Sequence, residues 1–142
     1  MSSKIGLNLT RYYSINFDLI KRSKRSIKFI IIHYTGMKKE SDAIKRLCDP
    51  KSKVSSHYFI KNNGEVLNLV PNLYTAWHAG VSFWKNYDSL NKYSIGIEIN
   101  NPGHSHKYKA FSYVQIHSLI KLLKYLLKKF NIKKKNVLGH SD

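Results

Sequence analysis

The chain has 142 residues, which is enough for one domain, and its hydrophobic content of 42% is enough for a globular core and excludes a disordered tail. Its single cysteine, Cys48, excludes an internal disulfide framework and a cysteine-rich zinc finger. A formal net charge of +17 is compatible with attraction to a polyanion and also with a lysine-rich, solvated surface.

The type of basic residue favours the second interpretation, a lysine-rich, solvated surface with incidental affinity for polyanions. Lysine far outnumbers arginine, although arginine is the better bidentate ligand for phosphates and bases. No nucleic-acid-binding motif is recognised, so we expect no specific nucleic-acid partner.

No apolar run is long enough to span a membrane, and residues 1–10 lack the features of a signal peptide. We expect a monomer without a transmembrane segment. We expect it in the cytoplasm, or exported if an upstream signal is missing from this sequence.

The first half of the chain contains one apolar strand and one short helix. Residues 1–26 are polar and basic and are interpreted as an N-terminal lead-in. The apolar, β-branched run from Ile27 to Tyr34 predicts a buried central strand. Helical spacing of apolar residues predicts a helix from Glu40 to Cys48, with Ser41 as a candidate cap and Pro50 following its end.

A hairpin and a long surface segment follow. Residues 56–60 and 65–70 have strand character and are joined by the turn sequence Asn62-Asn63-Gly64. Residues 74–92 are aromatic and rich in turn formers, without a regular period, and such long segments often carry function. Alternation from Tyr93 to Ile99 predicts another strand.

The clearest helix covers residues 112–130, where a broad apolar face is opposed by lysines. A basic turn at 133–135 precedes a last strand or loop at 136–140. The mixed order of elements predicts a single-domain α/β fold with a central mixed β-sheet flanked by helices.

Two histidines stand out by their positions. His33 lies near the end of the most apolar predicted strand, where a polar side chain is costly without a partner. It is either a core histidine bonded to the main chain or a metal ligand. His140, close to the end of the sequence, is either an exposed residue or a second ligand. Their spacing is not that of a local metal motif, so only the fold could bring them together.

Glu98 interrupts the apolar run of the strand predicted at 93–99. Buried carboxylates are rare unless they are paired, bound to a metal or shifted in pKa. Glu98 is therefore either an outward-facing strand residue or the general base of a hydrolytic metal site.

The segment Trp77-His78-Ala79-Gly80, followed by Phe83 and Trp84, is an aromatic loop. Aromatic faces suit sugar rings, so the loop is either a carbohydrate-binding surface or a loop packed on itself.

Five motifs occur in an order that resembles a known family. They are IIIHYT at 30–35, VSSHYFI at 54–60, LVPNLYTAWHAGVSFW at 69–84, NKYSIGIEINN at 91–101 and LGHSD at 138–142. They resemble the zinc-dependent N-acetylmuramoyl-L-alanine amidases, whose fold is shared with peptidoglycan recognition proteins and phage amidase-type lysozymes. The resemblance extends over residues 27–142, which we therefore assign to an amidase domain.

The resemblance implies a hydrolase that cuts the amide bond between N-acetylmuramic acid and L-alanine, in peptidoglycan or muropeptides, during cell-wall degradation or recycling. It implies zinc as cofactor, His33 and His140 as zinc ligands, and Glu98 as the residue that activates the attacking water. The residues implied to bind the muropeptide are Tyr34, His57, Trp77, His78, Ala79 and Asn100.

The sequence differs from the family at its end. In the family, the LGHSD stretch continues into a segment that supplies a catalytic lysine and a third zinc ligand, whereas this sequence ends at Asp142. We therefore expect an amidase domain that lacks the family's last segment. The alternative hypothesis is a peptidoglycan-binding module that does not hydrolyse its ligand.

Overall fold

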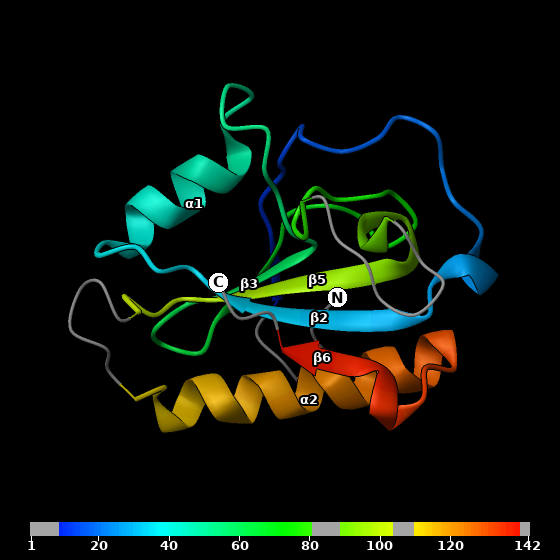
Figure 1. Ribbon diagram of the computed structural model, residues 1–142. Coiled ribbons are helices and arrows are strands. Elements are labelled where there is room, and N and C mark those ends of the chain that lie inside the picture. Colours follow the sequence, from blue (N-terminus) through cyan, green and yellow to red (C-terminus); the bar gives the residue numbers. More distant parts are fainter. Residues whose placement is uncertain (1–8, 81–88, 104–109, 140–142) are drawn as a thin grey trace.

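The computed structural model describes residues 9–80, 89–103 and 110–139 of the chain. In these ranges a mixed β-sheet with the strand order β1-β4-β3-β5-β2-β6 forms the middle layer (Figure 1). Helix α1, Glu40–Cys48, lies on one face of the sheet and helix α2, Tyr113–Phe130, on the other. The predicted α/β fold is confirmed. The strands are β1 Leu9–Arg11, β2 Phe29–Tyr34, β3 Tyr58–Ile60, β4 Val66–Asn68, β5 Ser94–Ile99 and β6 Val137–Gly139.

The central strands run parallel, and one hairpin makes the sheet mixed. β5 pairs in parallel with both β2 and β3, and β2 also pairs in parallel with β6. β3 and β4 are antiparallel, as the hairpin prediction requires. Gly64 closes the hairpin with φ +87°, a left-handed conformation that glycine adopts at no steric cost. The carboxyl ends of β2, β3 and β5 therefore lie side by side at the same end of the strands.

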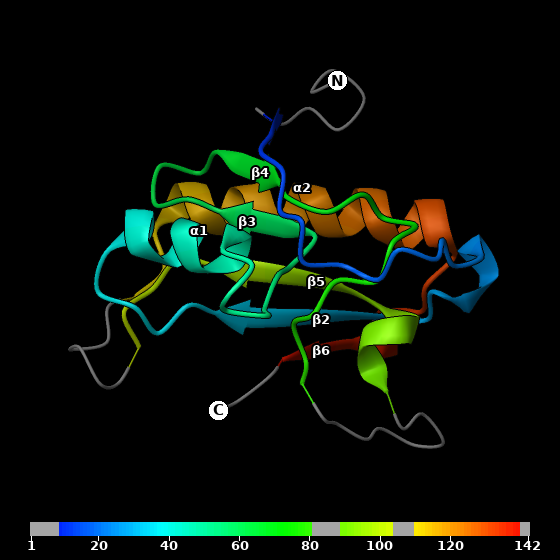
Figure 2. The same ribbon diagram turned by 90° about the horizontal axis from the view of Figure 1, so that it is seen from above.

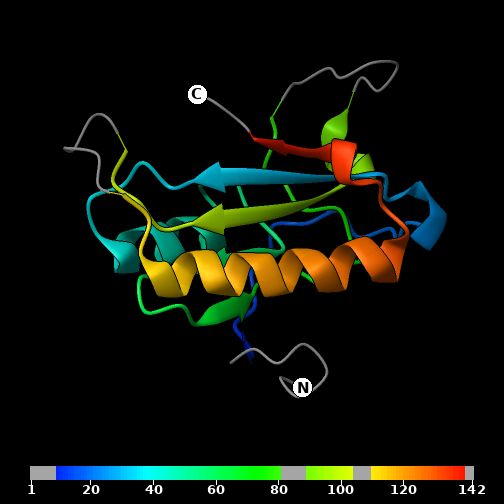
Figure 3. The ribbon, with the colours of Figure 1, turned by 90° about the horizontal axis from the view of Figure 1, so that it is seen from below.

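Alternation along β2 divides its side chains between the two faces of the sheet. Ile30 belongs to a core cluster with Leu122 and Leu126 of α2, which crosses that face of the sheet (Figure 3). Phe29 and Ile31 pack on the other face with Ala79 and Leu90. Because side chains of a strand alternate, His33 shares the face of Ile31, on the side of α1.

Capping residues define both ends of α2, whereas the N-terminal cap of α1 makes no side-chain hydrogen bond. Ser112 and Gln115 form a capping box, and Asn131 ends α2 in a left-handed conformation. The prediction of Ser41 as the cap of α1 is wrong, because the capping position is Lys39, which makes no side-chain cap bond. Acidic residues in the first turn, Glu40 and Asp42, instead complement the helix dipole.

The described part of the predicted lead-in belongs to the same layered unit. β1 pairs in parallel with β4, and Phe17 forms a bridge with Ala76. The Asn16 side-chain amide donates to the carbonyls of Asp49 and Val54. Figure 2 shows this segment running from β1 to the short 3-10 helix η2, Lys24–Ser26. These contacts are polar and long-range, so local hydrophobic periodicity does not reveal them.

Two further 3-10 helices of the described ranges connect the strands, η3 Leu90–Tyr93 before β5 and η5 Lys134–Asn136 before β6. Within the ranges that the structure describes, no helix has the length and apolar character needed to cross a membrane.

Candidate active site

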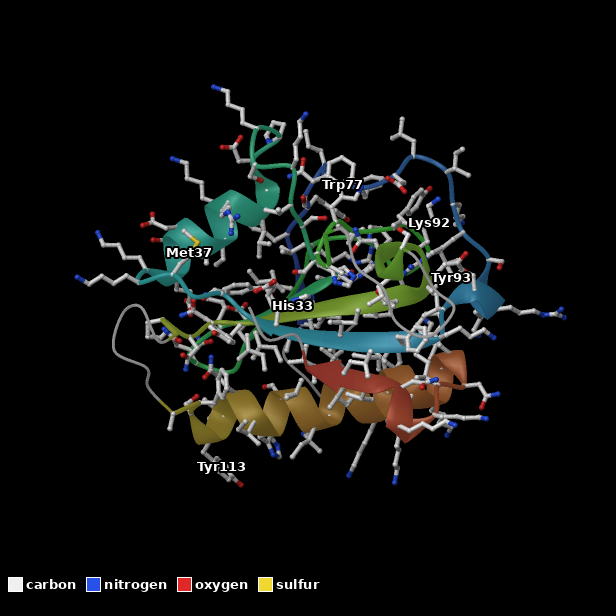
Figure 4. All side chains as sticks on the ribbon, viewed as in Figure 1. His33, Met37, Trp77, Lys92, Tyr93 and Tyr113 are labelled. Carbon is white, nitrogen blue, oxygen red and sulfur yellow. The ribbon has the colours of Figure 1, made fainter. Side chains whose placement is uncertain are left out.

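Strands β2 and β5 bring His33 and Glu98 together. The two residues are register partners at the carboxyl ends of adjacent parallel strands. Glu98 is also the register partner of Phe59 on β3, so it occupies the central strand of the three. His33 is 6% exposed and Glu98 is half-buried. Figure 4 shows His33 at the carboxyl end of β2, on the face where α1 lies. Ligands of open α/β sheets commonly bind next to the carboxyl ends of the strands.

A pocket of about 180 Å³ lies at this position. Five of its lining residues were predicted to be functional: His33, Tyr34, Trp77, His78 and Glu98. The remainder of the lining consists of Thr35, Met37, Ala43, Arg46, Leu47, Val54 and Ser55. The sequence therefore singled out these five lining residues but none of those that α1 contributes, Ala43, Arg46 and Leu47.

Arg46 adds a positive charge to the pocket and was not predicted from the sequence. It lies on α1 three residues after the buried Ala43, and residues with this spacing are neighbours on a helix surface. That spacing is the signal that could have identified it, once the face of α1 toward the sheet was known.

His78 lies across β5 and contacts His33. Its Nδ1 is 2.9 Å from Nε2 of His33, and its Nε2 is 3.1 Å from the Ser94 hydroxyl. The ring fits because β5 has a glycine at this point: a Cβ atom on Gly96 would lie 2.4 Å from Cγ of His78. Asn91 holds the loop, because its side-chain oxygen accepts from the main-chain N–H of His78, at 3.1 Å, and from that of Ala79.

We expect Gly96→Ala to displace the His78 ring and to destabilise the fold by about 1–3 kcal/mol, because overpacking a filled site forces shifts of this cost. Gly139→Ala is the matched control, since a Cβ atom on Gly139 would meet no atom of the described residues within 4 Å. Urea unfolding of both variants measures the difference in the free energy of unfolding. Equal stabilities of the two variants would contradict the close contact.

His57 lies in the interior, with its ring centroid 6.0 Å from that of His78. Its side chain is fully buried, Nδ1 accepts from the Gly96 N–H at 3.0 Å, and Nε2 donates to the Tyr74 carbonyl at 2.8 Å. Burial, and secondarily the positive charge of Arg22, lower the pKa of His57 to about 3, whereas the bond to Tyr74 acts in the opposite direction. His57 is therefore neutral near pH 7. The geometry supports a role in holding β5 in place and does not support direct contact with a substrate.

Arg22, which the sequence did not single out, connects the loops around the site. Its guanidinium donates to the carbonyls of Asn72, Asn91 and Lys92. Burial lowers its pKa to about 10, and the charge of Asp18 opposes that shift. No local pattern could have identified this contact, because its partners lie 50 to 70 residues away along the chain.

The other predicted substrate-binding residues fall into two groups. Tyr34 and Trp77 are half-buried in the pocket wall, and the Trp77 indole N–H donates to Asp18 at 2.8 Å. Ala79 and Asn100 are buried, and the Asn100 side chain donates to Asn62 at 2.8 Å. Phe83, Trp84 and His140 lie outside the described residues.

The residues around His33 suit a zinc ion in their chemistry. A buried imidazole supplies a nitrogen donor of the kind that zinc binds, and the contact with His78 supplies the outer partner that a ligating histidine usually has. Among the described residues no group of three or more His, Cys, Asp or Glu side chains could hold a metal. His140, the second expected ligand, is not among them.

A comparison with protein families identifies the family to which this sequence belongs. Residues 23–142 match the model of the N-acetylmuramoyl-L-alanine amidase family. The chain belongs to this family. The match confirms the resemblance inferred from the ordered motifs, and it covers most of this chain.

Named amidases are among its relatives. N-acetylmuramoyl-L-alanine amidase AmiD of Escherichia coli is 40% identical over 128 residues, which cover 82% of the amidase-family chain and 45% of AmiD. The 1,6-anhydro-N-acetylmuramyl-L-alanine amidase AmpD of Haemophilus influenzae is 29% identical over 147 residues, covering 91% and 77% of the two chains.

A solved structure of E. coli AmiD in complex with the substrate anhydro-N-acetylmuramic acid-L-Ala-D-γ-Glu-L-Lys has the same fold. Its TM-score is 0.72 at 34% sequence identity, and the match covers 88% of the amidase-family chain and 51% of that structure. The chain thus spans about half the length of AmiD.

Proposed function

We propose that this chain hydrolyses the amide bond between N-acetylmuramic acid and L-alanine in peptidoglycan or its muropeptide fragments. The observation that carries the proposal is the pairing of His33 with Glu98 on adjacent central strands, at a pocket that Trp77 and His78 also line. Membership of the amidase family and the likeness to AmiD with its bound substrate support the same reaction.

Glu98 is the general base of the proposed reaction. A carboxylate at the pocket floor takes a proton from the attacking water and returns it to the leaving amine of L-alanine. Half-burial suits this role, because the carboxylate reaches the pocket while the sheet holds its main chain fixed on both sides. The products are a sugar with a lactyl carboxylate and a stem peptide with a new N-terminus.

His33 and His140 are the residues that would hold zinc. When bound, zinc polarises the amide carbonyl and allows water to act as a nucleophile near neutral pH. The aromatic rings of Tyr34 and Trp77 at the pocket wall supply flat apolar surfaces for the sugar and the start of the peptide.

We propose anhydro-muropeptides as well as larger wall fragments as substrates. The E. coli AmiD complex contains an anhydro-N-acetylmuramic acid peptide, and the name of the H. influenzae relative specifies the 1,6-anhydro form. We propose muropeptide recycling in the cytoplasm as the setting of the reaction.

The test is an assay of stem-peptide release from a purified anhydro-muropeptide, in which chromatography measures the released peptide. We expect release that a chelator abolishes and added zinc restores. Release that is insensitive to chelation would contradict the proposed use of zinc. Binding of the muropeptide without release would support the alternative function, a non-catalytic peptidoglycan-binding module.

A further inference from the structure

A line of polar groups extends from the pocket to the start of β5. His33 Nε2 contacts His78 Nδ1 at 2.9 Å, and His78 Nε2 contacts the Ser94 Oγ at 3.1 Å. Ser94 Oγ lies 2.6 Å from the main-chain carbonyl oxygen of Leu90. Ser94 is fully buried, so water does not compete for its hydroxyl.

The carbonyl at the end of this line fixes the direction of its hydrogen bonds when the His78 imidazole is neutral. A carbonyl oxygen only accepts, so the single hydroxyl proton of Ser94 is donated to Leu90. Ser94 Oγ must then accept from His78, which places the His78 ring proton on Nε2. In a neutral imidazole the other nitrogen is an acceptor, so His78 Nδ1 accepts from Nε2–H of His33.

We infer that His78, backed by Ser94, is a positioning residue that fixes His33 in the tautomer whose proton is on Nε2 and whose unprotonated nitrogen is Nδ1. A neutral imidazole binds a metal through its unprotonated nitrogen, and the hydrogen bond made by the other nitrogen selects which one that is. The inference rests on the proposed function, because it assigns to His78 a role toward the metal ligand of the amidase site.

The surroundings hold the His78 ring in this position. Gly96 leaves room for the ring above β5, where a Cβ atom would lie 2.4 Å from Cγ. The Asn91 side chain fixes the main chain at His78 and Ala79 through two hydrogen bonds. The His78 ring is thus held by its main chain, by the sheet below and by Ser94. Because His78 is held, it can orient His33 in advance, and a ligand oriented in advance binds its metal more tightly.

The tautomer can be measured in the metal-free full chain. Long-range proton–nitrogen NMR spectra at about pH 8, above the ordinary imidazole pKa of about 6.5, distinguish protonated from unprotonated ring nitrogens. We expect His33 and His78 both to carry the proton on Nε2. A proton on Nδ1 of His33 in the wild-type chain would overturn the inference.

Variants test whether the contact with His78 matters for metal binding. His78→Phe keeps a ring but removes the acceptor, and we expect its zinc affinity to be roughly 10–100 times weaker. His78→Asn places an oxygen near the position of Nδ1, and we expect it to restore most of the affinity and the Nε2 tautomer of His33. His117→Gln removes an exposed histidine of α2 and serves as the control.

Zinc titration by calorimetry, with folding checked by circular dichroism, separates the outcomes. Equal zinc affinities of folded His78→Phe and wild-type chains would overturn the inference. If His78→Phe does not fold, the His33 tautomer is instead measured by NMR in the wild-type chain and in Ser94→Ala. We expect a mixture of His33 tautomers in Ser94→Ala, because His78 then loses the acceptor that fixes its own ring proton. Zinc binding with the expected tautomer but without hydrolysis would contradict the proposed function and leave the inference standing.

Discussion

Replacing Glu98 by Gln should lower the rate of stem-peptide release by roughly 10²–10⁴-fold, the usual contribution of a general acid–base group. Gln has nearly the same shape and fits the same place on β5, but it cannot take a proton from water. Because the aromatic pocket wall is unchanged, we expect KM to change far less than kcat. The kinetics of release from an anhydro-muropeptide at saturating zinc measure both constants.

Glu65→Gln is the matched control, because it makes the same chemical change at the hairpin, where Glu65 pairs with Lys61 at 3.1 Å and not with the pocket. We expect it to retain wild-type kcat. A Glu98→Gln variant with kcat within a few-fold of wild type would show that another group removes the proton.

His57 should make the stability of the fold strongly dependent on pH in mild acid. Its folded-state pKa is about 3 and its ordinary value is 6.5, so the unfolded chain binds one proton more between these limits. The free energy of unfolding is therefore highest above pH 6.5 and falls as the pH decreases toward 3. The slope from this residue alone is about 1.4 kcal/mol per pH unit well inside that window.

Urea unfolding at several pH values between 4 and 6.5, run in parallel on wild type and His57→Asn, isolates this contribution, because the other titrating groups are common to both. Asn keeps an acceptor for the Gly96 N–H, so the variant should fold, with lower stability near neutral pH and a flatter slope. Parallel slopes of the two proteins would show that His57 does not remain neutral in the folded state.

Local patterns predicted most of the helices and strands. α2 was predicted to within one residue, because its broad apolar face and the opposing lysines indicate a helix over the same residues. β2 was recognised by its run of β-branched residues, and the β3–β4 hairpin by its turn residues. β1 was missed because three residues in an edge strand, two of them exposed, carry too little pattern.

The sequence singled out part of the pocket lining, for a comparable reason. His33 and Glu98 stood out because each interrupts an apolar strand, and their register in the sheet explains why both do so. Sequence reasoning gave His57 and His78 the same role, although one is fully buried and the other lines the pocket. Only long-range contacts separate them: the main-chain groups of Gly96 and Tyr74 surround His57, whereas His78 lies over Gly96 and reaches His33.

The most direct test of the central claim is to identify the bond that is cut and the origin of the oxygen that enters. The full chain is incubated with an anhydro-muropeptide in water enriched in oxygen-18, and the products are analysed by mass spectrometry. We expect the label in the lactyl carboxylate of the muramic acid product and an unlabelled stem peptide that begins with L-alanine. Label in a peptide fragment, with the sugar still attached to L-alanine, would contradict the assignment of this pocket to the amidase reaction.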